Sequence, residues 1–129
     1  MKVIDVNNLE ATSRCVICPG GGFKSIRPVL KSDGMGYSVT VTTIYPMAGP
    51  QVWHYKNHLE SCYCIEGKAK IKNLDTGEMH SIYPGVIYVL DKHDKHEFTA
   101  ITEVKLICVF NPPLNGTEVH NKERSYERE

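Results

Sequence analysis

The stretch that most clearly indicates the fold is Tyr37-Ser38-Val39-Thr40-Val41-Thr42, in which bulky and hydroxyl-bearing side chains alternate. This alternation predicts a β-strand with one face toward the interior, because successive side chains of a strand point to opposite sides of the sheet. On either side of it, short runs rich in Val, Ile, Thr and Tyr are separated by turn signals such as Asp75-Thr76-Gly77. About nine such strands at regular spacing predict an all-β sandwich or barrel.

The composition is that of one globular domain. The chain has 129 residues, 41% of them hydrophobic, and its 15 Lys and Arg balance 15 Asp and Glu. This neutral balance argues against a nucleic acid or an acidic lipid surface held by bulk charge. We expect a single domain over residues 1–129, with an N-terminal segment 1–22 that contains a Gly-rich loop, a barrel over 23–113, and a charged C-terminal tail or lid over 114–129. Short helical segments are expected near the termini.

The N-terminus and the cysteines bear on the cellular compartment. Residues 1–11 lack the apolar run of a signal peptide, and no stretch approaches the roughly 18 apolar residues of a membrane span. We therefore expect a cytoplasmic protein whose five cysteines are reduced thiols. Cys15-Val16-Ile17-Cys18 is a CxxC motif that could belong to a zinc site or a redox pair. The sequence offers no second CxxC and no βαβ context, which favours ordinary thiols.

Two segments carry candidate metal ligands. In the first, Trp53-His54-Tyr55-Lys56-Asn57-His58-Leu59-Glu60 is followed by Gly67, a spacing that resembles the first metal-binding motif of cupins. In the second, a Pro-Gly turn at 84–85 begins a strand that places Tyr88 where cupins have an inward-facing histidine, and His96 follows that strand. Three oxygen and nitrogen donors from separate segments would leave coordination positions open for a substrate, as a Lewis-acid metal requires.

The period of a strand places other residues beside these donors. Glu60, Cys62 and Cys64 fall on one face, so the two cysteines line the barrel interior if Glu60 does. Carboxylate, phenol and imidazole together suit Fe(II) or Zn(II). Simpler interpretations remain: His96 as a solvated residue of a charged turn, and Tyr88 as a core residue with its hydroxyl at the rim.

Longer strings are similar to one family, the ectoine synthases of the cupin superfamily. The resemblance extends from about Phe23 to His120. It rests on residues 33–36 (DGMG), 42–45 (TTIY), 55–60 (YKNHLE), 63–67 (YCIEG), 90–94 (LDKHD) and 108–114 (CVFNPPL), and on Val119-His120. Strings of this length and order are more specific than the short cupin motif.

The resemblance implies a homodimeric jelly-roll barrel that binds Fe(II), with Zn(II) or another divalent metal as an alternative. It implies a hydro-lyase that cyclises a small amino-acid substrate, N-γ-acetyl-L-2,4-diaminobutyrate, to the compatible solute ectoine made under osmotic stress. The implied metal ligands are Glu60, Tyr88 and His96. The implied pocket residues are Phe23, Ser25, Arg27, Thr40, Thr42, Tyr55, Cys108, Phe110, Glu118 and His120, with Glu118 and Tyr55 as candidates for proton transfer.

The sequence also departs from the family. Phe23 stands where the family usually has Trp, Thr40 where it often has a larger polar residue, and Pro28 follows Arg27 and would favour an edge strand. Because barrel metal sites host many reactions, another metal-dependent cupin enzyme, such as an isomerase or oxygenase, is one alternative. The departures at Phe23 and Thr40 leave a second, a ligand-binding cupin without catalysis. Lys56, where the second histidine of the common cupin pair would stand, weighs against the oxygenase alternative.

Overall fold

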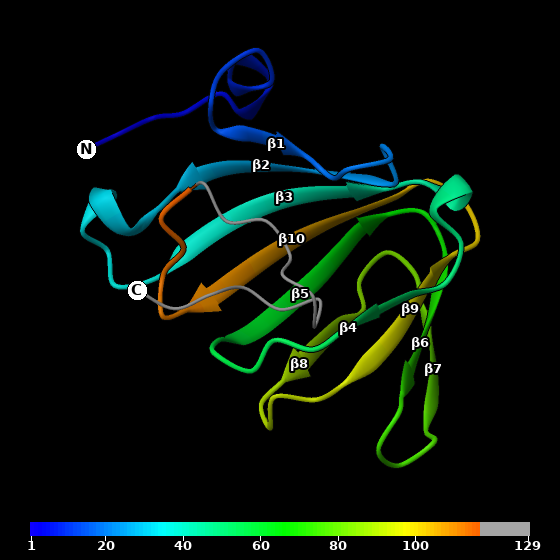
Figure 1. The fold of residues 1–129 in the computed structure, drawn as a ribbon. Coiled ribbons are helices and arrows are strands. Elements are labelled where there is room, and N and C mark those ends of the chain that lie inside the picture. The colour runs from blue at the N-terminus through cyan, green and yellow to red at the C-terminus, as the bar shows by residue number, and fades with distance from the viewer. Residues whose placement is uncertain (117–129) are drawn as a thin grey trace.

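The protein is built from two antiparallel sheets that face each other (Figure 1). The computed structural model describes residues 1–116, and ten strands fall within them. The larger sheet contains, in spatial order, β1 (Cys15–Ile17), β2 (Phe23–Val29), β3 (Ser38–Ile44), β10 (Val104–Asn111), β5 (Leu59–Glu66) and β8 (Ile87–Leu90). The smaller sheet contains β4 (Gln51–Trp53), β9 (His96–Ala100), β6 (Ala69–Asn73) and β7 (Met79–Ile82).

Helical structure within residues 1–116 consists of three short 3-10 helices, η1 (Val6–Leu9), η2 (Lys31–Asp33) and η3 (Pro46–Ala48). The prediction of an all-β cupin-like barrel with a short helical segment near the N-terminus is confirmed. The segment expected near the C-terminus lies outside the described residues. None of the helices in this part of the chain has the length and apolar character needed to cross a membrane.

Strand β3 has the predicted period, and its polar side faces inward. Ser38 and Thr40 are buried, whereas Val39 and Val41 lie partly exposed on the outer face. Oγ of Ser38 accepts a hydrogen bond from the backbone N–H of Leu114 at 3.0 Å, which satisfies a buried polar atom. Strand β3 therefore presents hydroxyl groups to the interior at Ser38 and Thr40, and valine side chains to its outer surface.

Strand β2 corrects one expectation. Pro28 does not make it an edge strand, because β2 pairs with β3 on one side and with β1 on the other. Pro28 lies instead where the register with β3 shifts, between Ile26 and Val29. A proline cannot donate to a regular ladder, and an irregularity of this kind accommodates it inside a sheet.

The core fills the space between the sheets. In the smaller sheet, Phe98 of β9 stacks on Trp53 of β4 at a ring-centroid distance of 5.8 Å. Val104 and Leu106 of β10 point into the same interior from the larger sheet. On β10 the inward positions continue with Cys108 and Phe110, and on β5 with Glu60, Cys62 and Cys64. Core residues and candidate functional residues thus occupy the same inward faces.

Candidate active site

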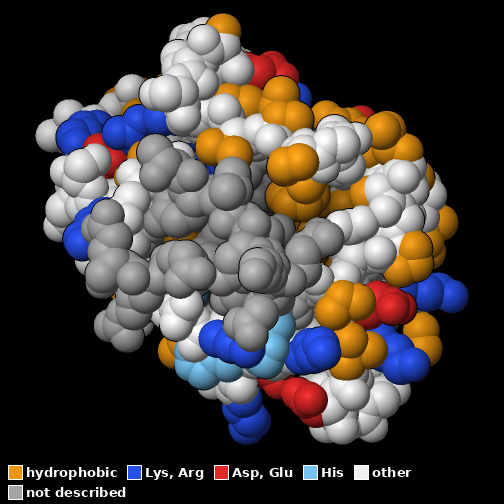
Figure 2. Space-filling view, in the orientation of Figure 1, with side chains coloured by type: hydrophobic (Ala, Val, Ile, Leu, Met, Phe, Trp, Pro, Cys, Tyr) orange, Lys and Arg blue, Asp and Glu red, His pale blue; other side chains and the backbone are white. Residues whose placement is uncertain are grey.

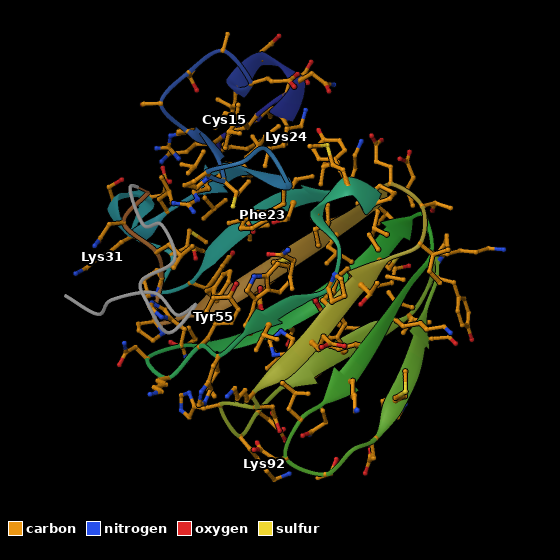
Figure 3. The ribbon with its side chains drawn as sticks, turned by 45° about the vertical axis from the view of Figure 1, so that its right-hand side comes forward. Cys15, Phe23, Lys24, Lys31, Tyr55 and Lys92 are labelled. Carbon is orange, nitrogen blue, oxygen red and sulfur yellow. The ribbon has the colours of Figure 1, made fainter. Side chains whose placement is uncertain are left out.

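The inner face of the larger sheet lines a small cavity of about 20 Å³, the size of roughly one water molecule. Most of the site residues predicted from the sequence border it: Phe23, Ser25, Thr40, Thr42, Tyr55, Glu60, Tyr88, Cys108 and Phe110. They come from β2, β3, β5, β8, β10 and the segment after β4. Phe23 and Tyr55 are labelled in Figure 3. The predicted residues Glu118 and His120 lie outside the described part of the chain.

Two cross-strand rows place the polar residues of this cavity. Tyr88, Cys62, Cys108 and Thr40 lie opposite one another on β8, β5, β10 and β3. In the next row Glu60 lies opposite Phe110 of β10. Residues directly opposite have Cβ atoms about 4.5–5.5 Å apart, so the register itself brings carboxyl, phenol and thiol groups together.

Glu60 is a buried carboxyl group whose surroundings favour its neutral form. Burial raises the pKa of Glu60 to about 7, and hydrogen bonds from the thiols of Cys62 and Cys108 act in the opposite direction. The residue is 7% exposed and forms no ion pair with any other residue in the described range 1–116. A bound cation at this place would stabilise the carboxylate form.

His96 begins β9 in the smaller sheet and is 1% exposed. Its Nδ1 lies 2.9 Å from the carbonyl oxygen of Asp94. Because a carbonyl only accepts, Nδ1 carries the proton and Nε2 keeps its lone pair. Burial lowers the pKa of His96, so the ring is neutral. Nε2 is buried and has no hydrogen-bond partner among the described residues.

Tyr88 lies near both the carboxyl group of Glu60 and the ring of His96. Its ring centroid lies 6.4 Å from that of His96, and its hydroxyl donates to the thiol of Cys62. Burial raises the pKa of Tyr88, and the neighbouring Cys62 and Glu60 raise it further. On its other side, Tyr88 borders a groove of about 680 Å³ between β7 and β8, which His96 also lines.

These features fit a divalent metal. A buried carboxyl group, a partly buried tyrosine and a neutral imidazole with an unused lone pair supply oxygen and nitrogen donors. The Nδ1 hydrogen bond of His96 is the outer contact that commonly fixes a metal-binding histidine. A second donor group among the described residues has another composition, however: Glu60, Cys62 and Cys108 place their donor atoms within 4.8 Å of one another.

Arg27 is deeply buried beside the pocket. Its Nε donates to Oγ of Ser25 at 3.2 Å, and Ser25 borders the cavity. Hydroxyl groups continue this polar strip on the neighbouring strand, where the oxygens of Thr40 and Thr42 lie 3.4 Å apart. A cationic and hydroxylic wall of this kind suits the carboxylate of an amino acid.

The sequence analysis missed two cavity features. Trp53 borders the cavity and meets Phe23 edge to face, with ring centroids 5.5 Å apart. It is the last residue of β4, two residues before Tyr55, which also borders the cavity. The contact of Cys62 with Cys108 was not foreseen, because it depends on the pairing of β5 with β10, which no local pattern reveals.

Comparison with known proteins identifies close relatives. The sequence profile described as ectoine synthase matches residues 1–129. L-ectoine synthase of Marinomonas sp. (strain MWYL1) is 51% identical over 123 residues, which cover 95% of each chain. L-ectoine synthase of Saccharophagus degradans is 48% identical over 129 residues, which cover 100% of this chain and 96% of the other.

Solved structures agree with this similarity. The crystal structure of ectoine synthase from P. lautus superposes with a TM-score of 0.86 at 40% identity, covering 95% of this chain and 86% of that one. KdgF from Halomonas sp. superposes with a TM-score of 0.60 at 17% identity, covering 70% of this chain and 81% of that one. The second likeness concerns the fold alone.

Proposed function

The chain belongs to the ectoine synthase family and has the activity of that family, and we propose that a divalent metal held by Glu60, Tyr88 and His96 assists it. The chain is a hydro-lyase that cyclises N-γ-acetyl-L-2,4-diaminobutyrate to ectoine with loss of water. The α-amino group of the substrate attacks an acetamide carbonyl, which is a poor electrophile. The pocket must therefore hold the two groups together and stabilise the charge that develops on oxygen.

The observation that carries the metal proposal is the state of His96. Its ring is buried and neutral, Nδ1 is held by the carbonyl of Asp94, and Nε2 has no partner among the described residues. Leaving a buried acceptor unsatisfied costs roughly 1–3 kcal/mol, which a metal ion would offset. Glu60 and Tyr88 supply the oxygen donors of the proposed set.

We propose Fe(II) as the metal. Nitrogen and oxygen donors suit several divalent ions, and tyrosine binds iron in other proteins. When bound, such an ion supplies Lewis-acid polarisation of the acetamide carbonyl. The barrel walls keep the polarised group away from bulk water, where its charge would be screened.

The remaining pocket residues bind and orient the substrate. In this proposal Arg27 and Ser25 hold the substrate carboxylate, because a planar guanidinium can bind both oxygens. Thr40 and Thr42 offer hydroxyl groups to the amide, and Cys108 lies beside them, its Sγ 3.9 Å from Oγ1 of Thr42. The apolar walls come from Phe23 and Phe110.

Proton transfer is assigned to Tyr55 and Glu118. The substrate amine must be neutral to attack, and an α-amino group has a pKa of about 8, so a nearby base is useful. Tyr55 packs edge to face on Phe110 with ring centroids 5.5 Å apart, which fixes its ring in the cavity wall. Glu118, and His120 as a substrate contact, complete the proposal from outside the described residues.

The test compares Fe(II)-loaded wild type with His96→Ala and His80→Ala, measuring ectoine by chromatography and iron by elemental analysis. Loss of a hydrogen-bond partner of a metal ligand lowers metal affinity or activity by roughly 10- to 100-fold. His96→Ala removes a ligand itself, so it should lower both bound iron and turnover by more than this. His80 is a matched control, because its side chain is 63% exposed and lies 3.2 Å from Glu78. Full iron content and turnover in His96→Ala would contradict the proposed ligand set.

We further propose that the chain is a homodimer. The outer face of the larger sheet carries an apolar row: Ile87, Tyr63, Ile107 and Val41 lie opposite one another on β8, β5, β10 and β3. Val89 and Val109 flank the row, and both are exposed. A contiguous apolar face of this kind is unusual on a monomer and supports contact with a second copy.

A further inference from the structure

A second group of donor atoms lies beside the proposed iron ligands. A carboxylate oxygen of Glu60 and the Sγ atoms of Cys62 and Cys108 lie within 4.8 Å of one another, and all three residues are buried. The strand register produces this arrangement, because Cys62 lies directly opposite Cys108 while Glu60 precedes Cys62 by two residues on the same face. Three of the potential metal ligands in the interior therefore converge on one point.

The two thiols face polar partners. Both interact with the carboxyl group of Glu60, and Cys62 also contacts Cys108 and the hydroxyl of Tyr88. The thiol of Cys108 donates to Oγ1 of Thr42 at 3.9 Å. Cys64 offers a contrast on the same strand. It is equally buried, but its Sγ lies 3.3 Å from the carbonyl oxygen of Glu66, turned to the backbone instead of to the carboxyl group. Burial alone thus does not place a cysteine in the cluster.

We propose that Glu60, Cys62 and Cys108 form a sulfur-rich metal site that takes a thiophilic cation, represented by Zn²⁺, in competition with the metal of the Glu60–Tyr88–His96 set. Thiolate ligands select zinc over harder ions, and zinc accepts three protein ligands with a fourth position open. Zn–S bonds of about 2.3 Å in a tetrahedron set two sulfurs about 3.8 Å apart, so the donors need only a small movement.

The chemistry of binding is balanced within the site. Zn²⁺ replaces the two thiol protons and the carboxyl proton of Glu60, all of which leave to solvent. Two Zn–S bonds and one Zn–O bond form with no change of oxidation state. The carboxylate of Glu60 is shared, so the two modes of binding exclude each other. Only this competition for Glu60 rests on the proposed function, because the thiolate site itself uses neither His96 nor Tyr88.

The test uses the full chain, reduced and free of oxygen, titrated with Co²⁺ as a spectroscopic substitute for Zn²⁺. Thiolate ligation gives an intense near-ultraviolet charge-transfer band, and added Zn²⁺ should abolish it. Cys62→Ser and Cys108→Ser should each lower the band by about half or more, because each removes one of two thiolates. Cys64→Ser is the matched control for a buried cysteine, and Cys15→Ser/Cys18→Ser is the control for the CxxC motif. Both should keep the band.

Each other outcome overturns the proposal. Absence of the band in the wild type contradicts the site. A band that survives Cys62→Ser but disappears in Cys15→Ser/Cys18→Ser also contradicts it, because the thiolates would then belong to the CxxC motif. If circular dichroism shows that a serine variant does not fold, X-ray absorption of the Zn²⁺-loaded Cys15→Ser/Cys18→Ser protein decides. Two sulfur neighbours support the site, and none overturns it.

His96→Ala separates the two proposals. It should lose iron while it keeps the Co²⁺–thiolate band. Retention of iron in this variant would count against the iron ligands alone, and loss of the band would count against the sulfur-rich site alone.

Discussion

Phe23 shows how closely a single residue is adjusted to its surroundings. Its ring meets Trp53 edge to face, and the cavity that both residues border measures about 20 Å³. Edge-to-face pairs of this kind contribute about 0.5–1.5 kcal/mol beyond burial of their surface. Trp53 thus brings an indole ring into this pocket from β4, opposite the ring of Phe23 on β2.

Replacing Phe23 with Trp should for this reason be harmful. The larger ring has to displace Trp53 or fill the substrate space, and overpacking costs about 1–3 kcal/mol of unfolding free energy. We expect a lower urea midpoint and a raised KM. Phe23→Leu is the control, because its smaller side chain leaves space in the pocket. It should lower the unfolding free energy but should not raise KM, since it does not crowd the substrate. A Phe23→Trp enzyme with unchanged stability and a lower KM would contradict this account.

The sequence allowed the placement of some candidate ligands to be predicted, but not that of others. Glu60, Cys62 and Cys64 could be placed on one face because the period of a strand is a local property. The unused Nε2 of His96 could not, since it depends on a backbone carbonyl of Asp94 whose direction only the fold determines. The roles of these side chains in catalysis stay predictions until the variants are measured.

At the level of elements, the turn from β5 to β6 depends on Gly67. This residue has a φ of +87°, and an added Cβ would lie 2.0 Å from the carbonyl oxygen of Glu103. Positive φ costs an L-residue about 1–2 kcal/mol, and here the contact with a backbone atom adds to that strain. The turn holds the end of the strand that carries Glu60 against β10.

Gly67→Ala should lower the unfolding free energy by roughly 2–4 kcal/mol, measured by urea denaturation. Gly77 is the matched control, with a φ of +82° and no atom within 4 Å of an added Cβ. Gly77→Ala should cost only about 1 kcal/mol, the strain of positive φ alone. Equal losses in the two variants would show that the close approach to Glu103 contributes nothing.

The sequence predicted where strands occur better than it predicted which face of a strand turns inward. Alternation at 37–42 indicated a strand, but which face turns inward depends on the cavity that Thr40 borders and on the backbone N–H of Leu114 that Ser38 accepts from. Pro28 indicated an edge strand and was misleading, because the N-terminal β1 supplies a further partner for β2. Local signals identify elements, whereas neighbours in space decide their environment.

For the whole molecule, the surface suggests how copies assemble. Among the described residues, Lys and Arg side chains and Asp and Glu side chains are both visible on the face shown in Figure 2. The outer row of the larger sheet is apolar instead, and Ile87 and Val89 of β8 are 57% and 55% exposed. Burial of these side chains would stabilise a pair of subunits by the hydrophobic effect.

Ile87→Lys should therefore shift the protein toward monomers in light scattering coupled to gel filtration. A lysine within the apolar row would have to be desolvated on association. Lys92→Ala provides a charge change outside the row and should leave the mass unaltered. A wild type that runs as a monomer, or an Ile87→Lys variant that remains dimeric, would contradict the proposed face.

The long-range arrangement was the least accessible from the sequence. Regular strand spacing and turn signals predicted the fold class, since both are local. The order β3-β10-β5-β8, which joins segments far apart in the chain, creates the thiol contact and the rows around the cavity. The division at residues 22 and 113 and the cytoplasmic location stay predictions.

The interleaving of donors and core on β5 and β10 constrains how such a chain can diverge. Glu60 and Cys62 face inward among packed side chains, while Ser61 and Tyr63 alternate with them on the outside. An inward change disturbs chemistry and packing together, so selection for turnover and selection for folding act on the same positions. Mutational drift should accumulate at every second residue, and a saturation library scored separately for abundance and turnover would show both scores falling in phase.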